Sequence, residues 1–120
     1  MNYVDGFVVP VPKAKLAAYR RIARKAGQIW REHGALEYVE CVADDVKPGK
    51  LTSFPQAVKL KPDEVVVFSW IIYASRAQRD RINKKVMTDP RLAEMMDPKT
   101  MQPFDGRRMF WGGFKTMIAL

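Results

Sequence analysis

The 120-residue sequence predicts an α+β fold in which helices pack on an antiparallel sheet, and three observations support this class. The segment 64–74, EVVVFSWIIYA, is an unbroken apolar run with the β-branched and aromatic composition of a buried strand. The segment 13–33 repeats apolar residues at spacings of three and four, as one face of a helix does, and a capping box at 75–78 marks the start of a second helix. Shorter apolar segments around them complete the order strand, helix, strand, strand, helix, strand.

The first strand and the first helix occupy the start of the chain. Residues 3–11 are predicted as a strand that its prolines end, because proline has no amide hydrogen to donate. The helix at 13–33 turns an apolar stripe toward the sheet and an arginine-rich side toward water, and Gly34 can adopt the left-handed conformation that closes it. His33, at this helix end, either bonds locally to a carbonyl or water, or contributes to a pocket.

A polar strand and a long connection come next. Residues 35–46 have the mixed pattern of an edge strand, and their carboxylates are not expected to be catalytic. Cys41 is expected to be a small core residue rather than a nucleophile. Residues 47–63 contain prolines and a glycine that exclude one regular element, but their apolar residues predict that the connection packs against the body or a partner, as a lid or an interface arm.

The central strand at 64–74 poses a packing problem. Both of its sets of alternate residues are apolar, so both faces of the sheet need apolar cover at this strand. A single layer of helices can cover only one face. We therefore expect the second face to be covered by more of this chain or by another copy of it.

A capping box predicts where the second helix begins. The Ser75 hydroxyl can accept from the amides of the first turn, and the Gln78 side chain can bond back to it. Asp89, followed by proline, ends this helix and starts a short one that contains the apolar residues Leu92, Met95 and Met96.

The last strand is predicted at 107–118, after an irregular connection at 97–106. Its adjacent Gly112 and Gly113 indicate either a bulge or a place where a ligand or another backbone comes close. With this strand, the order of elements is the split βαβ, ferredoxin-like arrangement, in which the first and third strands lie centrally. We expect residues 1–120 to form a single domain of this type.

The open face of such a sheet predicts self-association. Both helices of the ferredoxin-like arrangement lie on one side, so the other face of the apolar central strand meets water. Leaving a large apolar side chain wet costs about 1.5–3 kcal/mol. We therefore expect two copies to pack sheet to sheet as a homodimer.

Composition limits the compartment and the partners. Hydrophobic residues make up 48% of the chain, which is enough for a core, and Cys41, the only cysteine, excludes an internal disulfide. No Cys or His spacing resembles a structural zinc site, and no apolar run approaches the roughly 18 residues that a membrane span needs. The chain starts without a basic segment and a long apolar run, so we expect a cytoplasmic protein without a membrane partner.

Several strings of residues are shared with a known group of proteins, and they are Asp5–Val8, Phe68–Trp70, Ser75–Ala77, Phe104–Gly106 and Gly112–Phe114. Together these strings, which span nearly the whole chain, resemble the YbaA-like family of uncharacterised bacterial proteins. Membership implies the dimeric α+β barrel superfamily, which includes antibiotic-biosynthesis monooxygenases, haem-degrading enzymes and small-molecule binding proteins. No functional residues are established for the family, so the resemblance carries none over to this chain.

The first functional hypothesis is a cytoplasmic homodimer that binds a small, partly apolar metabolite between sheet and helices. The resemblance implies a monooxygenase-like activity for such a protein. Ligand pockets are mostly apolar with a few polar anchors, and the candidates here are Trp30, His33, Trp70, Tyr73, Asn83, Arg108 and Trp111. The sequence assigns no catalytic residue, metal or cofactor. Haem-binding relatives use an axial histidine, and only His33 could serve in that role.

Two alternatives remain. The net charge of +8, from 21 Lys and Arg against 13 Asp and Glu, and the similarity of the topology to an RNA-recognition fold favour an RNA-binding module. Against it, the central strand lacks the glycine and the basic residue of the RNA-recognition signature, and a dimer would bury the sheet. We therefore expect no nucleic-acid partner. The other alternative is a pure assembly role without a ligand.

Overall fold

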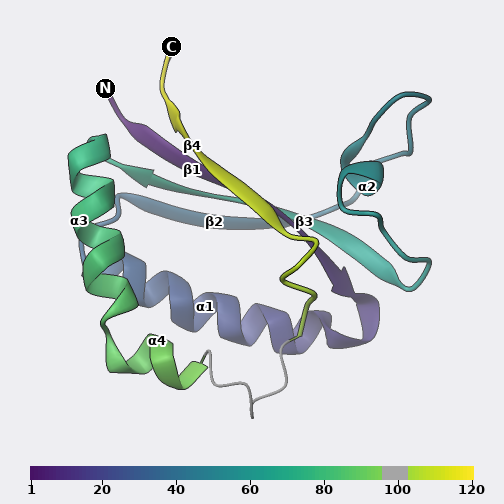
Figure 1. The fold of residues 1–120 in the computed structure, drawn as a ribbon, viewed down its shortest axis with the longest axis horizontal. Coiled ribbons are helices and arrows are strands. Elements are labelled where there is room, and N and C mark those ends of the chain that lie inside the picture. Colours follow the sequence, from purple (N-terminus) through teal and green to yellow (C-terminus); the bar gives the residue numbers. More distant parts are fainter. Residues whose placement is uncertain (96–102) are drawn as a thin grey trace.

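The computed structural model describes residues 1–95 and 103–120 and places a four-stranded antiparallel sheet against a layer of helices (Figure 1). The strand order is β2–β3–β1–β4. The central strands are β1 (Tyr3–Pro12) and β3 (Glu64–Tyr73), and the edges are β2 (Glu37–Val42) and β4 (Phe110–Lys115). The α+β, ferredoxin-like arrangement expected from the sequence is therefore confirmed.

The first helix crosses one face of the sheet. A 3₁₀ turn, η1 (Lys13–Lys15), leads from β1 into α1 (Leu16–Glu32), so the α-helix begins three residues later than the sequence predicts. The delay arises because the chain uses these residues to turn from the direction of β1 into that of α1. Gly34 has a φ of 118° after the helix, which is the left-handed conformation expected at this end.

Two further helices lie on the same side of the sheet as α1, and Figure 1 shows them at the left and below the strands. The first, α3 (Arg76–Met87), begins after Ser75, whose Oγ accepts from the Gln78 amide at 3.1 Å, as the capping box predicts. The second is α4 (Pro90–Met95). The predicted helical residue Met96 and the connection at 97–102 lie outside the described residues. Within the described ranges, no helix is long and apolar enough to cross a lipid bilayer.

The core between sheet and helices is built from alternate residues of the strands. In β3, the odd-numbered residues Ile71 and Tyr73 are buried against Ile29 of α1 and Ile82 of α3. Residues of β1 that pair with them lie on the same face, because paired residues in a sheet point to the same side. We call this side the helix face and the opposite side the open face.

Part of the open face is covered by the chain itself. The connection at 43–63, here called the arm, contains a short helix, α2 (Phe54–Ala57), and Figure 1 shows it at the right-hand end of the sheet. Val58 of the arm is only 1% exposed and packs against Val8 and Val66 on the open face. The connection therefore packs against the body, which is one of the two arrangements that its apolar residues predict.

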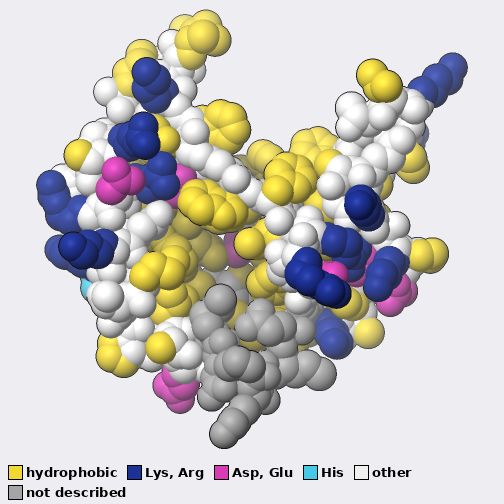
Figure 2. Space-filling view, viewed as in Figure 1, with side chains coloured by type: hydrophobic (Ala, Val, Ile, Leu, Met, Phe, Trp, Pro, Cys, Tyr) yellow, Lys and Arg dark blue, Asp and Glu magenta, His cyan; other side chains and the backbone are white. Residues whose placement is uncertain are grey.

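The rest of the open face stays uncovered. Phe68, on β3, is 41% exposed, although its ring contacts Phe54 of the arm and Trp70, each at 5.8 Å between centroids. Phe110 and Phe114 of β4 are exposed on the same face. Figure 2 shows hydrophobic side chains exposed along the strands, between the lysines and arginines around α3 and those toward the arm. Cys41 is exposed here too, so the prediction that it is a core residue is wrong for a single chain, because β2 is an edge strand.

Both edge strands are shorter than the sequence predicts. β2 ends at Val42, since the chain leaves the sheet into the arm after the Ala43 amide bonds to the Val66 carbonyl. β4 begins only at Phe110, because the preceding residues turn around Asp105 instead of pairing with β1.

The glycine pair in β4 does not form a bulge. The register with β1 is regular through Gly112 and Gly113, so the bulge alternative is wrong. Instead, side chains approach Gly113 closely: a Cβ there would lie 2.4 Å from Tyr3 Oη and 2.8 Å from Arg79 Nη2. The groups closest to Gly113 are therefore side chains of the same chain, whereas the sequence analysis expected a ligand or another backbone there.

Candidate functional site

A groove runs between α1 and the edge strand β2, with a volume of about 1040 Å³. Its floor is mostly apolar and includes Tyr19, Ala23, Tyr38 and Val67. Gly27 of α1 makes room for the floor, since a Cβ at this position would lie 2.6 Å from Cδ1 of Tyr38. The absence of a side chain at Gly27 therefore lets the Tyr38 ring pack closely against the helix.

Two acidic residues line the groove: Glu32, which pairs with Arg91 at 2.7 Å, and Glu40. Glu40 lies on β2 opposite Ser69 of β3, which directs its side chain to the helix face. The Tyr19 hydroxyl donates to its Oε1, and the Tyr38 hydroxyl donates to its Oε2 at 2.6 Å. Burial, and then the Glu40 carboxylate, raise the pKa values of both tyrosines, so their hydroxyls stay protonated as donors. A carboxylate has about four acceptor sites, so Glu40 can accept further hydrogen bonds from a ligand.

A second set of polar side chains, here called the inner polar cluster, lies deeper on the helix face. The Asn83 side chain of α3 accepts at Oδ1 from Trp30 Nε1 at 3.0 Å and from Tyr73 Oη at 3.2 Å. Asp5 of β1 is 1% exposed, and its Oδ1 lies 3.8 Å from Nη1 of Arg79. Burial raises the pKa of Asp5, while Arg79, Tyr73 and Asn83 oppose part of that rise.

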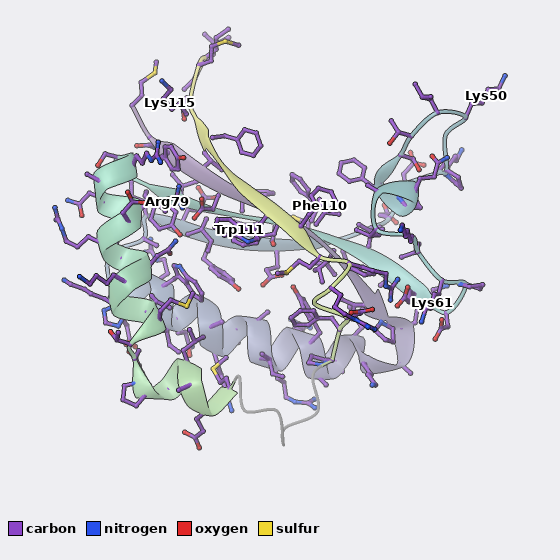
Figure 3. All side chains as sticks on the ribbon, viewed as in Figure 1. Lys50, Lys61, Arg79, Phe110, Trp111 and Lys115 are labelled. Carbon is purple, nitrogen blue, oxygen red and sulfur yellow. The ribbon has the colours of Figure 1, made fainter. Side chains whose placement is uncertain are left out.

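The inner polar cluster and the groove are neighbours. The rings of Trp30 in the cluster and Tyr38 in the groove have centroids 6.2 Å apart. Figure 3 shows Arg79 pointing from α3 toward the strands, where it also donates to Tyr3 Oη at 3.1 Å. The strands thus place two acidic groups on the helix face: Glu40 accepts from two phenols, whereas among the described residues the buried Oδ1 of Asp5 has Arg79 nearby but no hydrogen-bond donor.

The structure brings together three of the seven predicted pocket residues: Trp30, Tyr73 and Asn83 all belong to the inner polar cluster. Trp111 lies on the same face, where its ring stacks on Phe7 at 5.9 Å between centroids. Figure 3 shows Trp111 below β4, on the side of the helices. It lies at the β4 edge of the sheet, on the far side from the groove.

Three predicted residues lie elsewhere. Trp70 pairs with Gly6 and lies on the open face, away from the helices. His33 bonds through Nε2 to Asp89 Oδ2 at 2.9 Å, which ties the end of α1 to the start of α4. In the described part of the chain, no group of three or more His, Cys, Asp or Glu side chains could hold a metal ion.

Arg108 has a structural role in this arrangement. Its Nη2 lies 2.6 Å from Glu64 Oε2 and its Nε lies 3.0 Å from Asp105 Oδ2, and it also donates to the carbonyls of Val58 and Lys59. The hydrogen bonds from Arg108 lower the pKa of Glu64. Hydrogen bonds from the Arg108 side chain and the Arg107 amide lower the pKa of Asp105 to about 2. These contacts join the approach to β4 with the start of β3 and the arm, so Arg108 is not free to meet a ligand.

The sequence analysis missed Asp5, Tyr19, Tyr38 and Glu40 as site residues. Two signals for them are present in the sequence. Asp5 is the only charged residue in the first apolar strand, and Tyr38 and Glu40 are two apart on one strand and so share a face. No sequence spacing places Tyr19 beside Glu40, because the two lie on different elements.

Comparisons with solved structures show the class of fold. A variant of SnoaB, a cofactor-independent oxygenase from Streptomyces nogalater, has a TM-score of 0.61 at 9% identity, with 99% of this chain and 96% of that chain covered. A dimeric ferredoxin-like protein from an uncultured marine organism has a TM-score of 0.57 at 8% identity, with both chains fully covered. At such identities the likeness concerns the fold alone.

Comparisons of the amino-acid sequence show to which family this chain belongs. The sequence model of the family described as "Protein of unknown function (DUF1428)" matches residues 2–106, so the chain belongs to the DUF1428 family. The uncharacterised protein YbaA of Escherichia coli strain K12 is 52% identical over 118 residues, which are 98% of each chain. The resemblance to the YbaA-like family is thereby confirmed.

Proposed function

We propose that this protein is a homodimer that binds a small, partly apolar metabolite in the groove between α1 and β2. The groove itself is the observation that carries the proposal: about 1040 Å³ of space over a mostly apolar floor, with Glu40 held in place by Tyr19 and Tyr38. Ligand sites combine such a volume and apolar lining with a few oriented polar groups. The inner polar cluster adjoins the groove where Trp30 contacts Tyr38, and a hydrogen bond to Asn83 holds Trp30 there.

The open face supports the homodimer. Exposed aromatic rings such as Phe68 and Phe114 lie on it, and the arm covers only one end. The strands place no lysine or arginine side chain on this face. A surface that binds the phosphates of RNA needs such cations, whereas a large apolar surface is typical of an interface between subunits. A second copy of the chain therefore fits the open face better than RNA does.

The homodimer predicts the effect of a charge at the centre of the open face. Phe68→Asp should convert the protein from dimer to monomer at micromolar concentration, because a dimer would have to bury the carboxylate unpaired. Sedimentation velocity measures the change, and circular dichroism checks that the variant is folded. Met87→Asp is the matched control, since Met87 is exposed on α3, away from the sheet, and should leave the dimer intact. A wild-type protein that sediments as a monomer contradicts the proposal.

If the groove is the ligand site, a larger side chain placed in it should weaken ligand binding. Val42 lines the groove and is 51% exposed, so Val42→Trp should obstruct this part of the groove with little effect on folding. In a thermal-shift screen of metabolites, we expect hits with the wild type and with Val42→Thr, which keeps the side-chain volume. Their affinity for Val42→Trp should fall at least about tenfold, which corresponds to about 1.4 kcal/mol. Hits that bind all three proteins equally, or a screen without hits, would count against the groove as the site.

An oxygenase reaction is the finer part of the proposal. SnoaB, a cofactor-independent oxygenase, shares the fold but not the sequence, so it supports a test and assigns no residue. Each hit from the screen is therefore incubated with the wild type and with Val42→Trp in an oxygen electrode. Uptake of O₂ that depends on both the hit and an open groove supports oxygenase activity; the absence of uptake with every hit rejects it and leaves a binding protein.

A further inference from the structure

We infer that the ligand of the groove is an organic acid, with an apolar body on the floor and an anionic head group at Arg20 and Arg24. This inference rests on the proposed ligand site and adds the chemical class of its ligand. Arg20 and Arg24 lie on the arginine-rich side of α1, which the sequence analysis placed toward water.

Arg20 and Arg24 occupy a special position on α1. They are four residues apart and so lie one above the other on the helix surface. Both line the groove, and both also line a second, smaller hollow of about 540 Å³ beside it. The two guanidinium groups therefore stand on the wall that the two hollows share, and the ligand can reach them from the apolar floor.

Neither of these two arginines has a carboxylate partner among the described residues. No carboxylate of residues 1–95 and 103–120 forms an ion pair with Arg20 or Arg24, whereas Arg79, Arg91 and Arg108 each have carboxylate partners. Arg31, further along the rim, donates to the backbone carbonyls of Ala35 and Leu36. Arg20 and Arg24 are exposed, and guanidinium groups match the geometry of carboxylate and phosphate oxygens.

Glu40 sets the orientation of the ligand. Its negative charge disfavours an anion at its own part of the floor, because like charges repel most strongly where water is partly excluded. Its free acceptor sites instead suit a hydroxyl or amine of the ligand. The head group is thus directed to the arginines, and the body of the ligand lies against Tyr19, Ala23 and Val67.

Carboxylate and phosphate head groups share this chemistry, so the test compares them on one apolar chain. Octanoate, octyl phosphate and uncharged octanol are titrated into the protein by isothermal calorimetry. We expect at least one of the two anions to bind about 10- to 100-fold more tightly than octanol, because hydrogen bonds to charged groups are worth that much. The tighter of the two anions identifies the head group.

Two double variants, each of which lacks two positive charges, test where the head group of the anion binds. Arg20→Gln with Arg24→Gln should reduce the affinity for the anion to that for octanol, while leaving octanol binding unchanged. Lys13→Gln with Lys25→Gln is the matched control, because it removes the same two charges from exposed positions that do not line the groove. Its affinity for the anion should stay within about twofold of the wild type, since exposed charges at a distance are screened by salt.

The outcomes separate this inference from the proposed function. If octanol binds as tightly as the anions and Val42→Trp abolishes binding, the groove is a ligand site but the inference about its ligand is wrong. Equal losses in the arginine and lysine variants, anion binding that survives Val42→Trp, or no binding of either anion to the wild type would also overturn the inference. The metabolite screen still judges the groove itself in each of these cases.

Discussion

Replacing Ile71 by Ala should lower the free energy of unfolding by about 2–5 kcal/mol, as large-to-small changes in packed cores do. Ile71 is 3% exposed on the central strand β3 and packs between α1 and α3, against Ile29 and Ile82. Truncation removes the apolar contacts with α1 and α3 and leaves a cavity between these helices and the sheet. Urea denaturation, followed by circular dichroism, measures the change.

The next residue in the chain provides the control. Ile72 has the same side chain but lies on the open face and is only half-buried. Ile72→Ala should therefore cost less than Ile71→Ala in dilute protein, where single chains predominate. At higher concentration its cost should rise, because a homodimer that uses the open face would bury this side chain. Equal costs for the two variants at every concentration would contradict the assignment of the two faces.

Replacing Gly113 by Ala should destabilise the protein by about 1–3 kcal/mol, the usual cost of overpacking. The new methyl group would lie 2.4 Å from Tyr3 Oη and 2.8 Å from Arg79 Nη2, so both side chains would have to move. Tyr3 is buried, and Arg79 is the cation beside Asp5. We expect the loss in urea denaturation and a change in the chemical environment of Arg79, visible by nuclear magnetic resonance.

Gly112 is the matched control for this substitution. A Cβ on Gly112 would meet only Phe114 Cε1 at 3.6 Å, which is an ordinary contact. Gly112→Ala should therefore keep the stability of a single chain within about 1 kcal/mol of the wild type. If the two alanine variants lose equal stability, the crowding around Gly113 is not the source of the cost.

Much of the fold could be predicted because its signals are local. The run at 64–74 shows a buried strand through its composition, and Ser75 with Gln78 marks a helix start through contacts three residues apart. The order of the elements then allows few topologies, of which the ferredoxin-like one was observed. The ends of β2 and β4 were less predictable, because the arm and the turn at Asp105 compete with strand pairing there.

The candidate site was less accessible to sequence reasoning. Trp30 and Asn83 could be named as candidates from their residue types, but their hydrogen bond joins positions 53 residues apart. Trp70 has the same composition signal as its neighbours, yet lies on the opposite face from the groove. Glu40 was set aside as an exposed edge residue, although Tyr19 and Tyr38 hold it in the groove.

From the order of its residues alone, this chain specifies which segments become strands and helices, since periodicity and capping depend on neighbours a few positions away. It also specifies that the central strand needs cover on two faces. The placing of Glu40 between two phenols, of Asp5 beside Arg79, and of Arg20 and Arg24 along a mostly apolar groove came only with the packing of α1 and α3 on the sheet. Such juxtapositions depend on the register and crossing of distant elements, which no local pattern encodes.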